Sequence, residues 1–104
     1  TPSTGDQIIE AGARAGEPVW DLPIPAEHAD LMDGNWVDLV NSAGPEYGGI
    51  QPALFLRHFI KSTPWAHLEV SGPVLEPSWN GTSANGFGIN LLCELLNMPR
   101  TSRT

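Results

Sequence analysis

The sequence predicts an α/β protein, because helical and strand periodicities alternate along one short chain. Apolar residues recur every three to four positions near 4–15, 52–61 and 86–97, as in helices packed on one face. Apolar and polar residues alternate at 65–71, which is typical of a strand. The chain has 104 residues, 40% of them hydrophobic, which suffices for the core of a single domain.

The charge balance argues against polyanionic partners. Five Lys and Arg residues stand against 12 Asp and Glu, a net charge of -7, whereas binding phosphate backbones requires clustered basic side chains. No apolar run approaches the roughly 20 residues that span a bilayer, and no signal peptide is visible. We therefore expect neither nucleic acid nor a membrane as a partner.

The first helix is predicted at 4–15. Ser3 or Thr4 can cap it, with Asp6 or Gln7 in the position of a capping box. Its narrow apolar stripe consists of Ile8, Ala11 and Ala15.

The next segment is dominated by proline. Gly16 is suited to the C-cap of the first helix. Prolines fix the backbone of 17–25 in an extended form. A short helix can follow, beginning at Pro25 or Ala26 and reaching Met32.

A turn at 33–35 leads to a short stretch that we expect to be buried, and then to a loop at 41–49. The short stretch consists of Trp36, Val37, Leu39 and Val40. Pro52 is suited to the first position of the helix at 52–61. The apolar face of that helix is Leu56, Phe59 and Ile60, widened by Ala53, Leu54 and Phe55.

The strand at 65–71 is the one convincing strand, and a lone strand leaves its backbone groups unpaired. We expect it to be buried in a sheet. Its partners are either weaker strands near 36–40 or polypeptide outside this chain.

After a proline-bearing loop at 72–80, residues 83–85 can cap the last helix, at 86–97. Its expected core face is Ile89, Leu92 and Leu96, flanked by Phe87, Leu91 and Leu95. Pro99 ends it, and the polar tail at 101–104 is expected to fray.

Residues with chemical potential are scattered. His67 and Glu69 share a face of the predicted strand, and with His58 they suggest a metal site, but zinc needs three or four converging ligands. A hydrogen-bonded core histidine is the favoured interpretation. Cys93 in the last helix is interpreted as a buried, inert thiol. The glycine pair at 48–49, before the helix predicted at 52–61, is interpreted as a helix-entry loop rather than an anion site. From these residues alone, the sequence shows no complete set of catalytic side chains.

Five blocks of sequence carry a family resemblance. Residues 16–23 read G-E-P-V-W-D-L-P and residues 64–72 read P-W-A-H-L-E-V-S-G, and three more blocks lie at 37–44, 53–59 and 85–92. Together they resemble the leucyl aminopeptidases, the two-metal cytosol aminopeptidase family, whose members typically read A-G-E-x-x-W-R-L-P and P-W-A-H-L-D-I-A-G.

The resemblance implies the C-terminal portion of an aminopeptidase-type α/β/α domain, with an incomplete sheet, over residues 1–104. The family's metal ligands and catalytic residues lie in two upstream motifs, V-G-K-G-x-x-x-D-S-G-G and N-T-D-A-E-G-R-L, which this sequence lacks. It therefore assigns no catalytic and no metal-binding residue here, and the chain alone is expected to be inactive. Two divalent ions, zinc or manganese, would belong to an N-terminal metal-bearing segment or chain.

By motif, the resemblance places Ala43, Ser71 and Val74 in the wall of the pocket for the first side chain of a peptide substrate. Ser71 replaces the usual alanine. Three other positions also depart from the family pattern: Asp21, Glu69 and Asn90. The resemblance further implies a homo-oligomer, a hexamer in the family, in the cytoplasm or an organelle.

The first hypothesis is therefore that the chain is part of an enzyme that releases N-terminal amino acids from peptides. Two other hypotheses remain open. One is a catalytically dead, family-derived structural subunit of a larger assembly, since fold does not imply function. The other is a free-standing binding module, which requires the predicted strand to find a partner within the chain.

Overall fold

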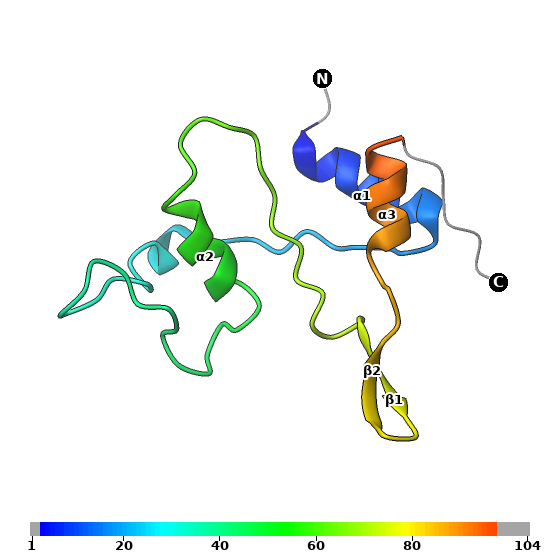
Figure 1. The fold of residues 1–104 in the computed structure, drawn as a ribbon. Coiled ribbons are helices and arrows are strands. Elements are labelled where there is room, and N and C mark those ends of the chain that lie inside the picture. Colours follow the sequence, from blue (N-terminus) through cyan, green and yellow to red (C-terminus); the bar gives the residue numbers. More distant parts are fainter. Residues whose placement is uncertain (1–2, 98–104) are drawn as a thin grey trace. The chain divides into compact units, whose positions relative to one another are not determined.

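The computed structural model describes residues 3–97 and contains helices and one small sheet (Figure 1). In chain order the elements are α1 (Thr4–Ala15), the 3-10 helix η1 (Ala26–His28), α2 (Gln51–Arg57), β1 (Leu75–Ser78), β2 (Gly81–Ala84) and α3 (Ile89–Leu95). The predicted α/β class is confirmed. The predicted tail at 101–104 and Pro99 lie outside the described residues.

The described chain divides into two compact units. Unit 1 combines residues up to Asp21 with residues from Val70 onward, and unit 2 runs from Leu22 to Glu69. Unit 1 therefore contains α1, α3 and the hairpin, and unit 2 contains η1 and α2.

The bounds of α1 are those predicted, and its capping interactions explain them. Ser3 is the N-cap: its hydroxyl oxygen accepts from the Asp6 backbone N–H at 3.1 Å, and its own backbone N–H donates to the Asp6 carboxylate at 3.0 Å. This reciprocal pair is a capping box. Gly16 ends the helix with φ 71°, a left-handed conformation that favours glycine.

Helices α1 and α3 pack side by side to form the core of unit 1 (Figure 1). Ile8, Ala11 and Gly12 are buried on α1, and Leu91 is buried on α3. Gly12 permits the close approach, since a Cβ there would lie 3.1 Å from Leu91 Cδ1.

The predicted core face of the last helix is wrong. The residues expected inside are more than two-fifths exposed: Ile89 54%, Leu92 45% and Leu96 63%. Leu91, expected at the flank, is the buried residue at 1%. Because α3 is apolar on nearly every side, periodicity alone did not decide which side meets α1.

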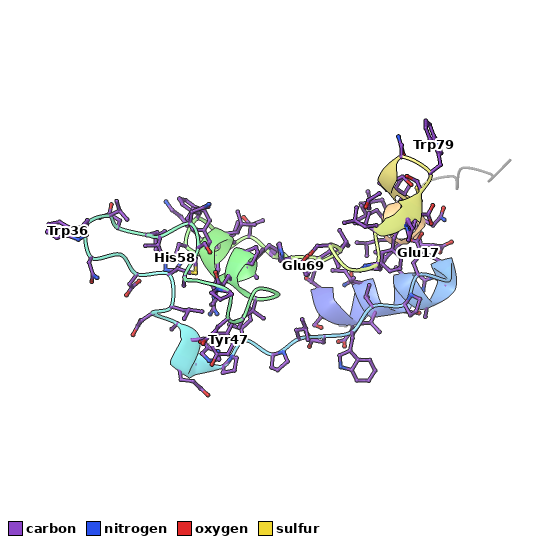
Figure 2. The ribbon with its side chains drawn as sticks, turned by 90° about the horizontal axis from the view of Figure 1, so that it is seen from below. Glu17, Trp36, Tyr47, His58, Glu69 and Trp79 are labelled. Atoms are coloured by element: carbon purple, nitrogen blue, oxygen red, sulfur yellow. The ribbon has the colours of Figure 1, made fainter. Side chains whose placement is uncertain are left out.

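The region predicted as a proline-bearing loop instead forms most of an antiparallel hairpin. Leu75 pairs with Ala84, and Ser78 pairs with Gly81 across a two-residue turn. Gly81 has φ 125°, which residues with side chains rarely adopt. Trp79 stands at the tip of this hairpin, 97% exposed (Figure 2).

The predicted strand at 65–71 is absent: within residues 3–97 the only strands are β1 and β2. Ala66, Glu69 and Ser71 are exposed, so the expected burial is also wrong. A strand needs a neighbour to pair its backbone, and the candidate partner at 36–40 is not a strand. There, the structure has one isolated bridge, between Asp33 and Leu39.

Unit 2 contains few regular elements. The predicted short helix is a single 3-10 turn, η1. Met32 is fully buried, and its carbonyl accepts from the Val40 N–H at 2.7 Å. The prediction that residues 36–40 are buried is wrong, since Trp36 is 99% exposed (Figure 2). Trp36 and Val37 lie in a short loop that the Asp33–Leu39 bridge closes, and little of unit 2 covers their side chains.

Helix α2 is shorter than predicted, and only part of its predicted apolar face is buried: Ala53 and Leu54, predicted to widen that face, lie inside. It ends at Arg57, and its buried residues are Gln51, Ala53 and Leu54. Leu56 and Phe59, predicted for the core face, are 44% and 64% exposed. Pro52, predicted as the first residue of this helix, is its second residue, still in the first turn where proline is tolerated. No helix among the described residues is long and apolar enough to cross a membrane.

Candidate functional site

The loop that carries Ala43 is held by one side chain, the amide of Gln51. The Gln51 Oε1 atom accepts from the Ala43 backbone N–H at 2.9 Å, and Nε2 donates to the Gly44 carbonyl at 2.8 Å and to the Glu46 carbonyl. The Ser42 hydroxyl also lies 3.5 Å from Oε1. Both ends of the amide are therefore engaged by the loop at 42–46.

Gln51 is well placed to hold this loop, because it is the first residue of α2 and 5% exposed. Residues 42–44 make no backbone-to-backbone hydrogen bond in the described part of the chain. Gly44 has φ 101°, so the loop also uses the conformational freedom of glycine. Ala43 itself is exposed.

Ser71 and Val74 lie in the turn that precedes the hairpin in unit 1. The Val74 N–H donates to the Val70 carbonyl at 3.0 Å, and the Val74 carbonyl accepts from the Asn85 N–H at 2.8 Å. The Asn85 side chain donates to the Pro73 carbonyl at 2.8 Å. Ser71 is exposed and Val74 is half-buried.

Two of the three predicted pocket residues thus share one short turn, and the third, Ala43, lies in unit 2. The convergence of Ala43 with Ser71 and Val74 stays a prediction.

Sequence reasoning missed Glu17, the one carboxylate residue that is buried within residues 3–97. Its Oε2 atom accepts from the backbone N–H groups of Gly88 at 3.0 Å and Leu91 at 2.9 Å, and Oε1 lies 3.4 Å from the Asn90 amide nitrogen. Glu17 is 4% exposed. A negative side chain at the start of a helix accepts from N–H groups that have no partner within the helix. Its charge is also attracted to the positive end of the helix dipole.

This arrangement also corrects the predicted cap at 83–85. The N-cap of α3 is Gly88, which supplies no capping side chain, so Glu17, more than seventy residues earlier, takes that role. The signal was in the sequence as the glutamate of the G-E-P block, directly after the C-cap glycine. It was overlooked because capping residues are sought next to the helix that they cap.

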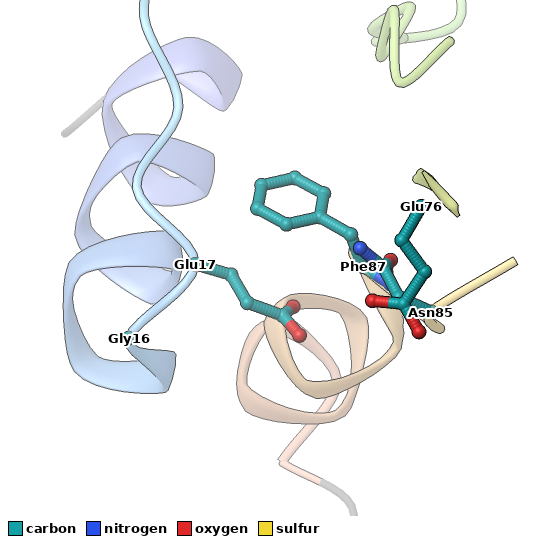
Figure 3. Close-up of a pocket in the computed structure, with 5 residues that line it drawn as sticks. All are labelled: Gly16, Glu17, Glu76, Asn85 and Phe87. Atoms are coloured by element: carbon teal, nitrogen blue, oxygen red, sulfur yellow. The ribbon is translucent and has the colours of Figure 1, made fainter. Parts of the chain in front are cut away.

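An open cavity of about 270 Å³ lies beside Glu17 (Figure 3). Its lining residues are Gly16, Glu17, Glu76, Asn85 and Phe87. The Glu17 carboxylate is already occupied by N–H groups of α3, and the Asn85 side chain is bonded to Pro73 and to the Phe87 N–H. Two of its polar side chains, Glu17 and Asn85, are therefore engaged in holding α3 and the hairpin.

The histidines do not form a metal centre with Glu69. His67 Nε2 lies 3.9 Å from Glu69 Oε2, and His58 Nδ1 lies 2.9 Å from the Leu54 carbonyl one turn earlier. No group of three or more His, Cys, Asp or Glu side chains able to hold a metal occurs in residues 3–97. Since two metal ions need such a set, the described residues do not fit them, and we assign no catalytic step to this chain through a metal.

The family of this chain follows from its similarity to known proteins. The model of the cytosol aminopeptidase family, catalytic domain, matches residues 2–93. The chain belongs to the cytosol aminopeptidase family. The resemblance carried by the five sequence blocks is thereby confirmed, and the helices with a small antiparallel sheet are consistent with a partial α/β domain of such an aminopeptidase.

Similar family members come from several bacteria and are named probable cytosol aminopeptidases. The protein of Brucella melitensis is 42% identical over 94 residues, which is 88% of this chain and 19% of that protein. That of Nostoc punctiforme is 41% identical over 90 residues, which is 83% of this chain and 18% of the relative. That of Trichormus variabilis is 39% identical over 92 residues, covering 85% and 18%. The chain spans about a fifth of the length of these relatives.

Proposed function

We propose that this chain serves as the C-terminal part of a metal-dependent aminopeptidase that releases N-terminal amino acids from peptides. The observation that supports this is the family match, which runs through nearly the whole described chain at about 40% identity. On this proposal the chain supplies pocket wall and core, whereas the metal ions, zinc or manganese, are held by a preceding segment or a separate chain.

The pocket-wall role rests on Ala43, Ser71 and Val74. All three lie in loops or turns rather than in helices or strands, and such segments commonly carry binding residues on a supporting scaffold. Small side chains at Ala43 and Ser71 leave room for a substrate side chain. We further propose that the working protein is a homo-oligomer, a hexamer as in the family, in the cytoplasm.

The proposal is tested by a fusion in which this chain replaces the matching 94 residues of the Brucella melitensis relative. Hydrolysis of leucine amide is measured with zinc or manganese for the fusion and for the unaltered relative. Metal-dependent turnover by the fusion supports the proposal. A folded, oligomeric fusion without turnover, beside an active relative, contradicts it and favours the structural-subunit hypothesis.

The pocket assignment has its own test in the same fusion. Ser71→Phe adds a ring to the pocket wall, so turnover of leucine amide falls relative to alanine amide, since each methylene is worth about 10–200-fold in such pockets. Ser62→Phe is the matched control, because Ser62 is an exposed serine outside the proposed wall. An equal leucyl-to-alanyl ratio in both variants would remove Ser71 from the pocket.

A further inference from the structure

We propose that Gln51 is the positioning residue of the substrate side-chain pocket: its amide fixes the loop at 42–46 and thereby the place of Ala43. This inference rests on the proposed function, because it takes Ala43 as part of the pocket wall. It adds a residue that neither the five sequence blocks nor the pocket assignment includes.

Both the oxygen and the nitrogen of the Gln51 amide are engaged by the loop at 42–46. A primary amide offers one oxygen acceptor and one nitrogen donor group. In Gln51 the oxygen takes the Ala43 N–H at 2.9 Å and the nitrogen gives to the Gly44 and Glu46 carbonyls. One planar amide thus makes hydrogen bonds to three backbone groups of one loop. These bonds fix both the orientation of the loop and its distance from the start of α2.

Residues 42–46 have little other support. Residues 42–44 make no backbone-to-backbone hydrogen bond within residues 3–97, and residues 42–46 are all exposed. The next residue, Tyr47, does have a ring contact, with His28 at 4.3 Å between ring centroids. A segment with few buried apolar contacts opens at low free-energy cost, so the position of residues 42–46 depends more on the Gln51 side chain than on packing.

Gln51 is also anchored by α2, outside residues 42–46. The Ile50 carbonyl accepts from the Leu54 N–H at 2.9 Å, which starts α2. The neighbouring Ala53 and Leu54 are buried. The helix end is the rigid element, and the amide transmits its position to Ala43, as a supporting side chain does for a binding residue.

Kinetics separate positioning from mere stability. Gln51→Leu keeps the bulk of the side chain and removes all of its hydrogen bonds. In the fusion described above, we expect KM for leucine amide to change about tenfold while KM for alanine amide stays within about twofold, with kcat for alanine amide retained.

Leu54→Ala is the matched control. Leu54 is 3% exposed in the same helix and is absent from the loop contacts. Its truncation destabilises α2 without touching the amide, so it lowers the active fraction for both substrates equally. Gln51→Leu behaving like Leu54→Ala, with an unchanged leucyl-to-alanyl KM ratio, would overturn the inference and leave the proposed function standing.

A second measurement does not require an active fusion. Amide hydrogen exchange of the 104-residue chain reports the Ala43 N–H directly. We expect Ala43 to be protected in the unaltered chain and to lose that protection in Gln51→Leu, and to keep it relative to α2 amides in Leu54→Ala. An unprotected Ala43 in the unaltered chain would overturn the positioning role whatever the fusion does, whereas an inactive fusion with a protected Ala43 would count against the proposed function alone.

Discussion

The two units each use one buried polar side chain to hold a segment in place, but they use opposite chemistry. In unit 1 the Glu17 carboxylate accepts hydrogen bonds from backbone N–H groups at the start of α3. In unit 2 the Gln51 amide both accepts from the loop and donates to it. Glu17 is 4% exposed and Gln51 is 5% exposed, so burial does not distinguish them.

The difference follows from what each side chain faces. The first turn of a helix presents N–H groups only, and an acceptor with negative charge matches it. A loop presents both N–H and C=O groups, and an amide is the side chain that satisfies both. We call Glu17 and Gln51 the clamps of unit 1 and unit 2. The backbone groups that each clamp holds determine whether a charged carboxylate or a neutral amide suits the site, so exchanging Glu and Gln should destabilise either site although the two side chains have the same length.

Removal of the unit 1 clamp is expected to have the largest effect. Glu17→Ala leaves the Gly88 and Leu91 N–H groups buried without an acceptor, and hydrogen bonds to a charged group are worth about 1.5–3 kcal/mol each. We expect the free energy of unfolding of unit 1 to fall by about 3 kcal/mol. Urea denaturation followed by circular dichroism measures it, and a loss below about 1 kcal/mol would show that α3 is capped in another way.

Exchanging the two chemistries sharpens the comparison. Gln51→Glu points a carboxylate oxygen at the Gly44 and Glu46 carbonyls, and we expect a loss of about 2–3 kcal/mol at neutral pH. Glu17→Gln retains an oxygen for the Gly88 and Leu91 N–H groups and should cost only about 1 kcal/mol.

The exchange at position 51 also predicts a pH response. The carboxyl introduced at position 51 is favoured in its protonated form, so Gln51→Glu should regain stability as the pH falls toward about 4. Denaturation midpoints at neutral and mildly acidic pH measure this. Equal costs for the two exchanges, or no recovery in acid, would contradict the account of why each site carries its residue.

The approach of α1 to α3 provides the next test. A Cβ at Gly12 would lie 2.6 Å from the Glu17 carbonyl oxygen and 3.1 Å from Leu91 Cδ1. Gly12→Ala should therefore destabilise unit 1 by about 1–3 kcal/mol through overpacking. Gly5→Ala in the same helix is the matched control, since its Cβ has room, and it should stabilise by up to about 1 kcal/mol. If both variants changed the free energy of unfolding in the same direction, close packing at Gly12 would be refuted.

The smallest expected effect concerns the capping box of α1. The Ser3 hydroxyl and then the Ser3 backbone N–H lower the pKa of Asp6. Because the folded pKa is lowered, this contribution to stability is present above the unfolded pKa of about 4 and is lost as the pH falls through the folded value. In Ser3→Ala the NMR titration midpoint of Asp6 should move up toward its ordinary value. A midpoint that does not move would mean that Ser3 is not the cause.

Sequence reasoning succeeded where short-range patterns determine structure. Ser3, Asp6 and Gly16 determine both ends of α1, and each signal lies within four residues of the end that it specifies. The family was also recognisable, because its blocks keep their order along the chain.

It failed where the decisive contact is distant or the pattern is degenerate. Glu17 caps a helix more than seventy residues away, so no local spacing reveals it. The apolar surface of α3 surrounds the helix, so Leu91 was not distinguished from Leu92. The predicted strand at 65–71 has the right alternation, but alternation does not supply a partner, and strands form among the described residues only at 75–78 and 81–84.

The candidate site shows the same division. Ala43, Ser71 and Val74 came from the resemblance, and their convergence remains a prediction. Gln51 was missed because a glutamine before a proline at a helix start has no recognised pattern. Its role becomes visible only when the loop is folded back onto the helix end.

Glu17 and Gln51 act separately: Glu17 holds the start of α3 in unit 1, and Gln51 holds the loop at 42–46 in unit 2. Residue-resolved amide hydrogen exchange on the unaltered chain, Glu17→Ala and Gln51→Leu tests it most directly. The account predicts that Glu17→Ala exposes the amide of Leu91 and leaves Ala43 protected, and that Gln51→Leu does the reverse. Loss of protection at both amides in either variant, or at neither, would contradict it.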